Sequence, residues 1–155
     1  MTKSPEENLQ SLGITLPAAP APAANYVPFI ISGNLVFISG QLPLVDGALQ
    51  MTGRVGDGVT TEQANQQARI CGINLLAQLK SACGGDLSRV RRVVKLGGFV
   101  ACIDGFTDHP EVINGASDLM GEVFGEAGQH ARFAVGTNAL PRGTVVEIEG
   151  IFEIA

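Results

Sequence analysis

Basic residues are scarce in this sequence. Its 155 residues include 10 lysines and arginines against 15 aspartates and glutamates, which gives a formal net charge of -5 at pH 7. A protein that binds nucleic acid usually presents an excess of positive charge to the phosphates. The one basic cluster, at Arg89, Arg91, Arg92 and Lys95, is interpreted as a solvated strand edge rather than a nucleic-acid groove. The charge balance therefore argues against nucleic acid as a partner.

Cysteine and histidine are also few. Cys71, Cys83 and Cys102 are odd in number and widely spaced, without a C-x-x-C pair and with no histidine nearby. They are predicted to be buried thiols in a reducing compartment. The two histidines, His109 and His130, lack the paired spacing of metal ligands, so no metal site is predicted.

Long apolar runs are missing as well, although 45% of the residues are hydrophobic. No run approaches the length of a membrane span, and residues 1–10 lack the apolar core of a signal peptide, so the expected location is cytoplasmic with no membrane partner. The glycines at 53–58 and 84–85 do not form a phosphate-binding loop, and no internal repeat is present. Because only 16% of the residues are charged, some apolar surface is expected to be buried between subunits.

The N-terminal part carries clear helix and connector signals. Ser4, Pro5 and Glu7 form a capping box that predicts a short helix to about residue 12. The segment after it is rich in proline and alanine and is predicted to be an extended connector. Residues 1–25 are therefore interpreted as a helix and an arm, and residues 26–155 as one domain.

The remaining chain alternates between strand and helix signals. Apolar runs around Gly33-Asn34 predict a hairpin, and one short strand is expected near residues 48–51. Thr60 with Gln63 forms a second capping box, which predicts a helix from about 61 to 82. Its buried stripe is predicted at five positions with helical spacing, namely Ala64, Ala68, Cys71, Leu75 and Leu79.

A second long helix is predicted from the capping signals at Asp108, Pro110 and Glu111 to about residue 125. The strand at residues 91–102 has apolar residues on both faces and is predicted to be central and covered on both sides. Two more strands follow between residues 130 and 154. The order β-β-α-β-α-β-β predicts an α+β fold, a mixed β-sheet with two helices packed on one face, and leaves the other face wet or covered by a partner.

The two C-terminal strands carry the candidate site. Arg132 and Ala134 share one side of the first strand, and Glu147 lies opposite an apolar row on the second. A guanidinium group matches a carboxylate through two parallel hydrogen bonds. Arg132 with Glu147 on a neighbouring strand is therefore either the floor of an anion pocket or an ion pair on a solvated face. Gly40 likewise marks either a bulge or a place where a ligand approaches the backbone.

Two motifs carry a family resemblance. Residues 33–43, GNLVFISGQLP, fit the pattern G-N-x-[IV]-x-x-S-G-Q-[IL]-P, and residues 131–149 fit A-R-x-x-V-x-x-x-x-L-P-x-x-x-x-V-E-I-E. In their order and spacing the sequence resembles the YjgF/YER057c/UK114 family, also called the RidA or endoribonuclease L-PSP family. Weaker similarity covers most of residues 26–153.

The resemblance implies a chorismate mutase-like fold that assembles as a homotrimer with active sites in clefts between subunits. It also implies cofactor-free and metal-free hydrolysis of enamines and imines, such as 2-aminoacrylate, to 2-keto acids and ammonia. Arg132 matches the arginine that holds the substrate carboxylate, and Glu147 matches the glutamate that positions or activates water. Tyr26, Gly40 and the backbone of Ala134 match residues that line the substrate pocket.

The sequence also departs from the family pattern. Ala134 replaces a common cysteine, Phe133 replaces a small polar residue, and the segment 104–128 is longer than in short members. These departures bear on substrate identity more than on the fold. Two alternatives remain open. One is a non-catalytic trimeric protein that binds or senses small carboxylates, and the other is the endoribonuclease activity of the family's older name, which the acidic charge does not favour.

Overall fold

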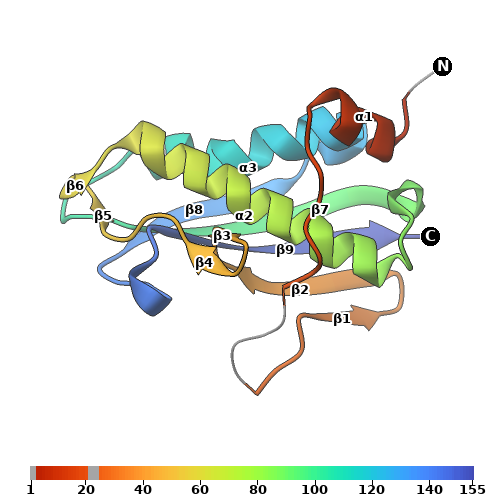
Figure 1. The fold of residues 1–155 in the computed structure, drawn as a ribbon, viewed down its shortest axis with the longest axis horizontal. Coiled ribbons are helices and arrows are strands. Elements are labelled where there is room, and N and C mark those ends of the chain that lie inside the picture. Colours follow the sequence, from red (N-terminus) through yellow and green to blue (C-terminus); the bar gives the residue numbers. More distant parts are fainter. Residues whose placement is uncertain (1–2, 21–24) are drawn as a thin grey trace.

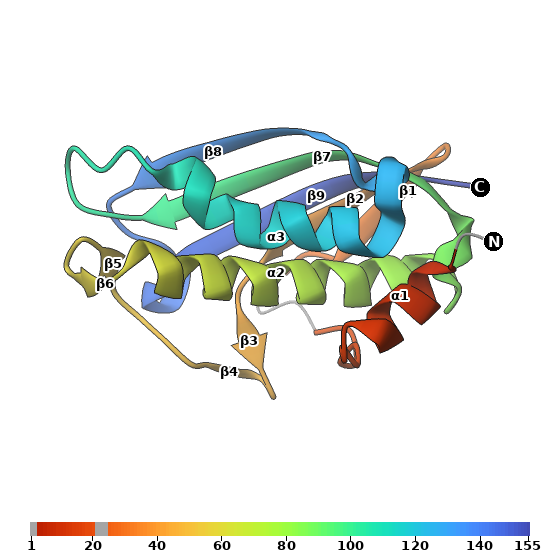
Figure 2. The same cartoon turned by 90° about the horizontal axis from the view of Figure 1, so that it is seen from above.

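The sheet of this protein has five strands, and two long helices cover one of its faces. A computed structural model describes residues 3–20 and 25–155. The strands lie in the order β1-β2-β9-β7-β8. Figure 1 and Figure 2 show α2 and α3 side by side on the same face of this sheet. The bounds of the five strands are β1 Phe29–Ser32, β2 Leu35–Gln41, β7 Val90–Ala101, β8 Ala131–Thr137 and β9 Val146–Ile154.

The strand pairing makes the sheet mixed, as predicted. β1, β2, β9 and β7 pair antiparallel in succession, whereas β8 pairs parallel to β7. The middle strand is β9 rather than β7. The prediction that the two C-terminal strands are neighbours is wrong, because β7 lies between β8 and β9. A parallel neighbour needs a crossover connection, and α3 supplies it between β7 and β8.

The helices begin where the capping signals predicted. α1 covers Pro5–Ser11 and α2 covers Thr61–Ala82, and both begin with a complete capping box. α3 covers His109–Phe124, but its N-cap residue Asp108 makes no side-chain capping bond, so that part of the prediction is wrong. None of the helices in the described part of the chain is long and apolar enough to span a membrane.

Short elements fill the long loop between β2 and α2. β3 (Leu44–Val45) pairs with β4 (Ala48–Leu49), and β5 (Arg54–Val55) pairs with β6 (Gly58–Val59). The sequence predicted only one of these four strands. Two-residue strands carry too little alternation to be recognised from a pattern.

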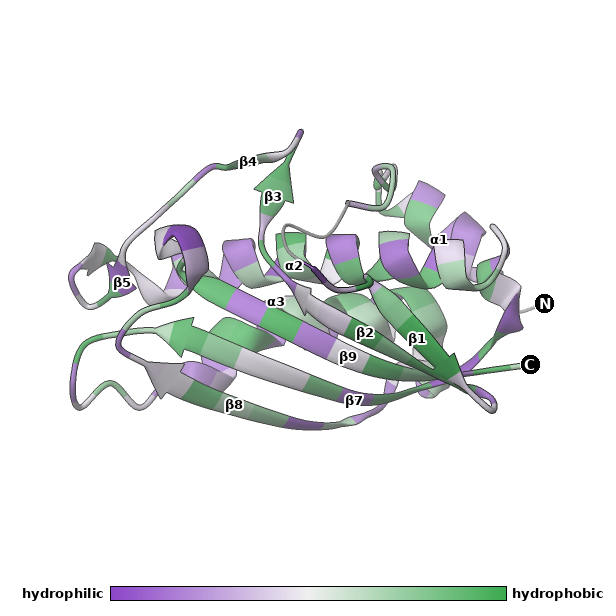
Figure 3. Cartoon of the chain, turned by 90° about the horizontal axis from the view of Figure 1, so that it is seen from below, coloured by the Kyte–Doolittle hydropathy of each residue, from purple (hydrophilic) through white to green (hydrophobic). Residues whose placement is uncertain are grey.

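The hydrophobic core lies between the helices and the sheet. The predicted stripe of α2 is confirmed, because all five of its residues are fully buried. The opposite sheet face is open in the single chain, so the prediction that β7 is covered on both sides is not met there. Phe37, Phe99 and Val135 are about 40% exposed on this face, at 42%, 39% and 41%. Figure 3 views the strands in front of the helices, with hydrophobic segments along β1 and parts of β7 and β8.

Two glycines allow α2 and α3 to pack closely. A Cβ atom on Gly115 would lie 3.0 Å from the backbone carbonyl carbon of Asn65 and 3.1 Å from the backbone nitrogen of Arg69. A Cβ atom on Gly72 would lie 3.0 Å from Leu119. Asn65 also donates a hydrogen bond from Nδ2 to the carbonyl oxygen of Glu111, at 2.8 Å. The position of α3 is thereby fixed relative to α2.

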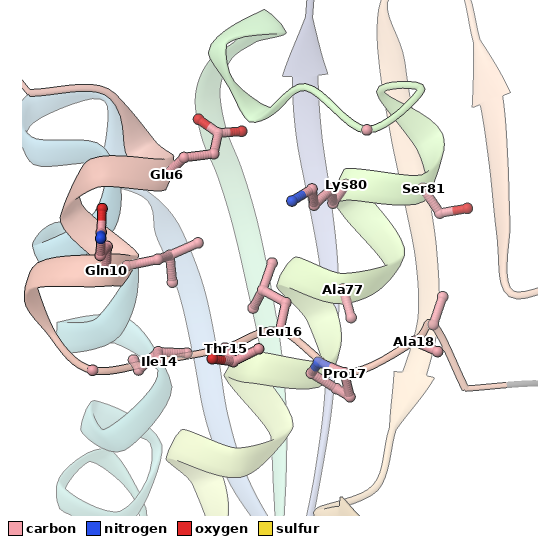
Figure 4. A pocket seen from close by; sticks show the side chains of 14 residues that line it. Glu6, Gln10, Ile14, Thr15, Leu16, Pro17, Ala18, Ala77, Lys80 and Ser81 are labelled. Atoms are coloured by element: carbon pink, nitrogen blue, oxygen red, sulfur yellow. The ribbon is translucent and has the colours of Figure 1, made fainter.

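The N-terminal helix and arm lie against the rest of the chain. Asn8 of α1 donates to the carbonyl of Val123 at 2.9 Å, and the Glu6 carboxylate accepts from the backbone N–H of Leu87 at 2.7 Å. The described part of the arm crosses α2, where Gln78 donates to the carbonyl of Pro20. Residues 21–24 of the predicted connector lie outside the described residues. Figure 4 shows the cavity of about 700 Å³ between α1, the arm and the end of α2.

Candidate functional site

The predicted site residues lie in two separate places. Tyr26, Gly40 and Glu147 lie on the open face of the sheet, whereas Arg132 and Ala134 lie on the helix-facing side of β8. The first group, together with Glu149, is called the face cluster below. The second group is called the seam cluster, because it lies in the seam between β8 and α3. It consists of Arg132 and Ala134 together with Asn114, Ser117 and His130.

Glu147 points to the open face because its neighbours on β9 point into the core. Val146 and Ile148 are fully buried on the helix side. Across from Glu147, β2 shifts register between Ile38 and Gln41, so Gly40 lies in a bulge. A Cβ atom on Gly40 would lie 3.0 Å from Cδ and 3.2 Å from Cγ of Glu147. Glycine at this position thus leaves the space that the Glu147 carboxyl group occupies.

The environment of Glu147 changes its acidity. Burial raises the pKa of the Glu147 carboxyl above its ordinary value, and the negative charge of Glu149 raises it further. Both effects disfavour the charged form. A carboxyl group whose pKa is raised toward the working pH can accept a proton and return it, as a general base and acid must.

A hollow of about 340 Å³ lies on the same face. Tyr26, Phe37, Ser39 and Glu149 are among its lining residues. Ser39 donates from its hydroxyl to the carbonyl of Val27 at 2.8 Å, which ties the segment beside Tyr26 to β2. Tyr26 is 48% exposed, so its ring and hydroxyl are accessible from outside. The structure therefore places Tyr26 at the same hollow as Glu149 of β9, a pocket residue that was not predicted from the sequence.

Phe133, which departs from the family pattern, also lies on the open face. Its ring packs against Phe99 with a centroid distance of 5.4 Å and an angle of 73°. The ammonium group of Lys95 lies 5.3 Å from the Phe133 ring centroid. A Cβ atom on Gly97 would lie within 3 Å of both the Phe133 ring and the Glu149 carboxylate. The aromatic pair therefore makes the open face more apolar beside Glu149.

Arg132 is held by α3 rather than by Glu147. Its Nη1 donates to Asn114 Oδ1 at 2.8 Å and to Ser117 Oγ at 3.0 Å. Its Nη2 donates to the carbonyl oxygen of Pro110 at 3.3 Å. A guanidinium group has five N–H groups. Within the described residues, the Nε–H and one Nη2–H of Arg132 have no acceptor, so both remain as donors for a carboxylate.

His130 extends this network. Its Nδ1 lies 2.6 Å from the carbonyl oxygen of Gly128, and its Nε2 lies 2.9 Å from Ser117 Oγ. A carbonyl oxygen only accepts, so Nδ1 carries a hydrogen, and in the neutral ring Nε2 accepts the Ser117 hydroxyl hydrogen. The sequence analysis missed Asn114, Ser117 and His130. Asn114 and Ser117 are one helical turn apart, and His130 precedes Arg132 by two residues, but these spacings do not show that α3 packs against Arg132.

The two charges that the sequence analysis placed together are apart in the single chain. Arg132 faces the helices and Glu147 faces away from them, and β7 lies between their strands. They form no ion pair in the part of the chain that the structure describes. Ala134 follows Arg132 on the helix-facing side, and its strand position pairs with Gly98 of β7. One chain therefore holds Gly40 and Glu147 together on the open face, with Tyr26 at the hollow beside Glu149 on that face, and it holds Arg132 with Ala134 on the helix-facing side.

The cysteines are free and buried, as predicted, with one correction. Cys71, Cys83 and Cys102 form no disulfide. The statement that no histidine lies near a cysteine is wrong for Cys102, because its Sγ is 3.6 Å from His109 Nε2. The fold brings the end of β7 against the first turn of α3. This contact could not be read from a sequence separation of seven residues.

Comparisons with known proteins agree with this architecture. Atu1372 of Agrobacterium tumefaciens, whose function is unknown, has a crystal structure that matches with a TM-score of 0.91 and 52% identity, covering 97% of this chain and 92% of that chain. Protein TCP17 of Trypanosoma cruzi is 49% identical over 148 residues, which are 95% of this chain and 92% of the relative. The 2-iminobutanoate/2-iminopropanoate deaminase of Dermatophagoides farinae is 29% identical over 141 residues, which are 91% of this chain and 94% of the relative.

A family model matches nearly the whole chain. The model described as "YjgF/chorismate_mutase-like, putative endoribonuclease" covers residues 6–151. This range contains both motifs, the complete sheet apart from the end of β9, and both clusters of the candidate site. The chain therefore belongs to the YjgF/chorismate mutase-like family.

Proposed function

We propose that this protein is a hydrolase that deaminates reactive enamines and imines, such as 2-aminoacrylate, to 2-keto acids and ammonia. The observation that carries the proposal is the Glu147 carboxyl group, which is half-buried, has a raised pKa and occupies the space left by Gly40. Membership of the family, with a relative named as a 2-iminobutanoate/2-iminopropanoate deaminase, supports the same reaction.

The proposed reaction needs one group that moves a proton. The enamine first takes up a proton from solvent at its terminal carbon and becomes an iminium ion. Water then adds to the iminium carbon, and Glu147 accepts a proton from that water while the C=N π electrons move to nitrogen. Glu147 returns the proton to nitrogen, the C–N bond breaks, and ammonia leaves as the hydroxyl group loses its proton to solvent and becomes the ketone, which balances the proton taken up at carbon. One enamine and one water give one 2-keto acid and one ammonia.

The substrate carboxylate is proposed to bind Arg132 of a second protomer. Arg132 and Glu147 face opposite sides of one sheet, so a single chain does not bring both charges to one substrate. A homotrimer in which the seam cluster of one protomer meets the face cluster of the next would form such a site in each cleft, with Tyr26 and the backbone of Ala134 at its walls. The exposed Phe37, Phe99 and Val135 on the open face support burial against a partner.

The test is hydrolysis of 2-aminoacrylate that a pyridoxal-phosphate enzyme generates from serine, followed as ammonia release above the spontaneous rate. The wild type is expected to accelerate release. Glu147→Gln is expected to lower the rate by a factor of roughly 100 or more, as loss of a general base usually does. Glu153→Gln is the matched control, because Glu153 lies on the same strand and binds Asn34 at 3.0 Å, away from Gly40. Equal rates for the wild type and Glu147→Gln would refute the proposal.

A second candidate function is the binding of small carboxylates without turnover. The two free N–H groups of Arg132 favour it, because they can hold a carboxylate without help from Glu147. This candidate predicts that pyruvate raises the melting temperature of the wild type and of Glu147→Gln but not of Arg132→Ala. It also predicts no ammonia release by any of the three. Ammonia release by the wild type above the spontaneous rate would exclude it.

A further inference from the structure

We propose that Ser117 and His130 are positioning residues for Arg132, which hold its guanidinium group so that the free pair of N–H groups faces the substrate carboxylate. The inference rests on the proposed function, because it assumes that Arg132 binds that carboxylate. It adds two residues to the site that neither family motif contains.

The hydroxyl group of Ser117 is directed at the His130 ring. A serine within a helix commonly donates its hydroxyl hydrogen to the carbonyl one turn earlier. Ser117 instead has His130 Nε2 at 2.9 Å as its partner. Because the only hydroxyl hydrogen goes to the ring, the oxygen lone pairs remain for Arg132 Nη1, which donates at 3.0 Å. The position of the His130 ring thus sets the direction of the Ser117 hydroxyl group, and that direction sets where the Ser117 oxygen accepts from Arg132.

A main-chain carbonyl group holds the orientation of the His130 ring. Its Nδ1–H donates to the carbonyl of Gly128, which ends the 3₁₀ turn Gly125–Gly128 after α3. That turn packs tightly on the helix, since a Cβ atom on Gly128 would lie 2.6 Å from the carbonyl carbon of Met120. The ring is therefore fixed by main-chain atoms, and its Nε2 stays directed at Ser117.

These hydrogen bonds restrain the guanidinium group of Arg132. Asn114 and Ser117 together use both hydrogens of Nη1, so rotation of the guanidinium plane would break two bonds at once. A free arginine side chain loses much rotamer freedom when it binds a ligand, and a pre-fixed side chain loses less. The network therefore favours carboxylate binding without touching the substrate.

The test compares pyruvate binding by calorimetry in the wild type, Ser117→Ala, His130→Phe, His130→Gln and Arg132→Ala. Ser117→Ala and His130→Phe are expected to weaken binding about tenfold, the usual size for one hydrogen bond to a charged group. His130→Gln can place an amide oxygen where Nε2 was but lacks the Nδ1–H that donates to Gly128, so it is expected to bind pyruvate more tightly than His130→Phe and more weakly than the wild type. Ser81→Ala on α2 is the matched control and is expected to leave binding unchanged.

The kinetic readout separates positioning from general damage. In the ammonia assay, Ser117→Ala is expected to raise KM about tenfold and to leave kcat within about twofold, because carboxylate binding is lost equally in the ground and transition states. Wild-type affinity in Ser117→Ala and His130→Phe, with weak binding only in Arg132→Ala, would overturn the positioning role and leave the proposed function standing. Binding of His130→Gln as weak as that of His130→Phe would also overturn it. Wild-type affinity in Arg132→Ala would remove the carboxylate role of Arg132 and the positioning role with it.

Discussion

The close contact between α2 and α3 makes Gly115 sensitive to the addition of a single methyl group. In Gly115→Ala the new methyl group would meet the carbonyl group of Asn65 and the backbone nitrogen of Arg69. These are main-chain atoms of a helix, so they cannot move aside as a flexible side chain can. The two helices must separate, or the new residue must distort α3.

The expected change in the free energy of unfolding of Gly115→Ala has two opposing contributions. Overpacking of a tight core contact typically costs 1 to 3 kcal/mol, and contact with main-chain atoms places this case near about 3 kcal/mol. Alanine favours a helix over glycine by about 1 kcal/mol. The net expectation is a loss of about 2 kcal/mol in the free energy of unfolding.

Gly121→Ala is the matched control on the same helix. Its Cβ atom would meet no atom within 4 Å, so only the helix propensity term remains, and a gain of about 0.5 to 1 kcal/mol is expected. Urea unfolding followed by circular dichroism measures both variants, at one protein concentration so that any subunit association affects them equally. The reasoning would be refuted if the two variants differed by less than about 1 kcal/mol, or if Gly115→Ala were as stable as the wild type.

Three further predictions concern acidity, capping and thiols. Glu147→Gln removes a carboxyl group whose raised pKa makes the wild type less stable as pH rises from the ordinary glutamate pKa through the raised one, so the variant should gain stability at about pH 8 and none at about pH 4. Melting curves across that range check this, and a gain that grows toward low pH would contradict it. Ser4→Ala removes the capping oxygen that accepts from Glu7 N, so α1 should lose about 1 kcal/mol of local stability and exchange its amide hydrogens faster. Unchanged exchange in α1 would argue against the cap. The three cysteines are buried, and burial raises the pKa of the Cys71 thiol. A thiol reagent should therefore react slowly with the native chain, and in denaturant it should label all three cysteines. Fast labelling of the native chain would contradict this burial.

Helix positions were predictable from sequence because their signals are local. The capping boxes at Ser4 and Thr60 each involve residues three positions apart, and both helices begin at the next residue. The buried stripe of α2 follows from its own periodicity. Asp108 is the exception, since its backbone places it before α3 but its side chain makes no capping bond.

The arrangement of the candidate site was less predictable, because it depends on contacts between distant segments. Alternation along one strand shows that Arg132 and Ala134 share a side, and that Glu147 opposes Val146 and Ile148. It does not show which side of β8 corresponds to which side of β9, nor that β7 lies between them. Arg132 stays on the helix side because it donates hydrogen bonds to Asn114 and Ser117 of α3, which lie 18 and 15 residues away in the sequence.

The docking of α1 has a consequence for the order of events during translation. Its hydrogen bonds reach Leu87 and Val123, which follow their partners by 81 and 115 positions. The ribosome therefore releases the first helix long before the surface that receives it has been made, and contacts of such long range close slowly. Until then Leu9, which is only 5% exposed in the finished fold, has no core to enter. A nascent chain would thus keep α1 available to chaperones or proteases until Val123 had emerged.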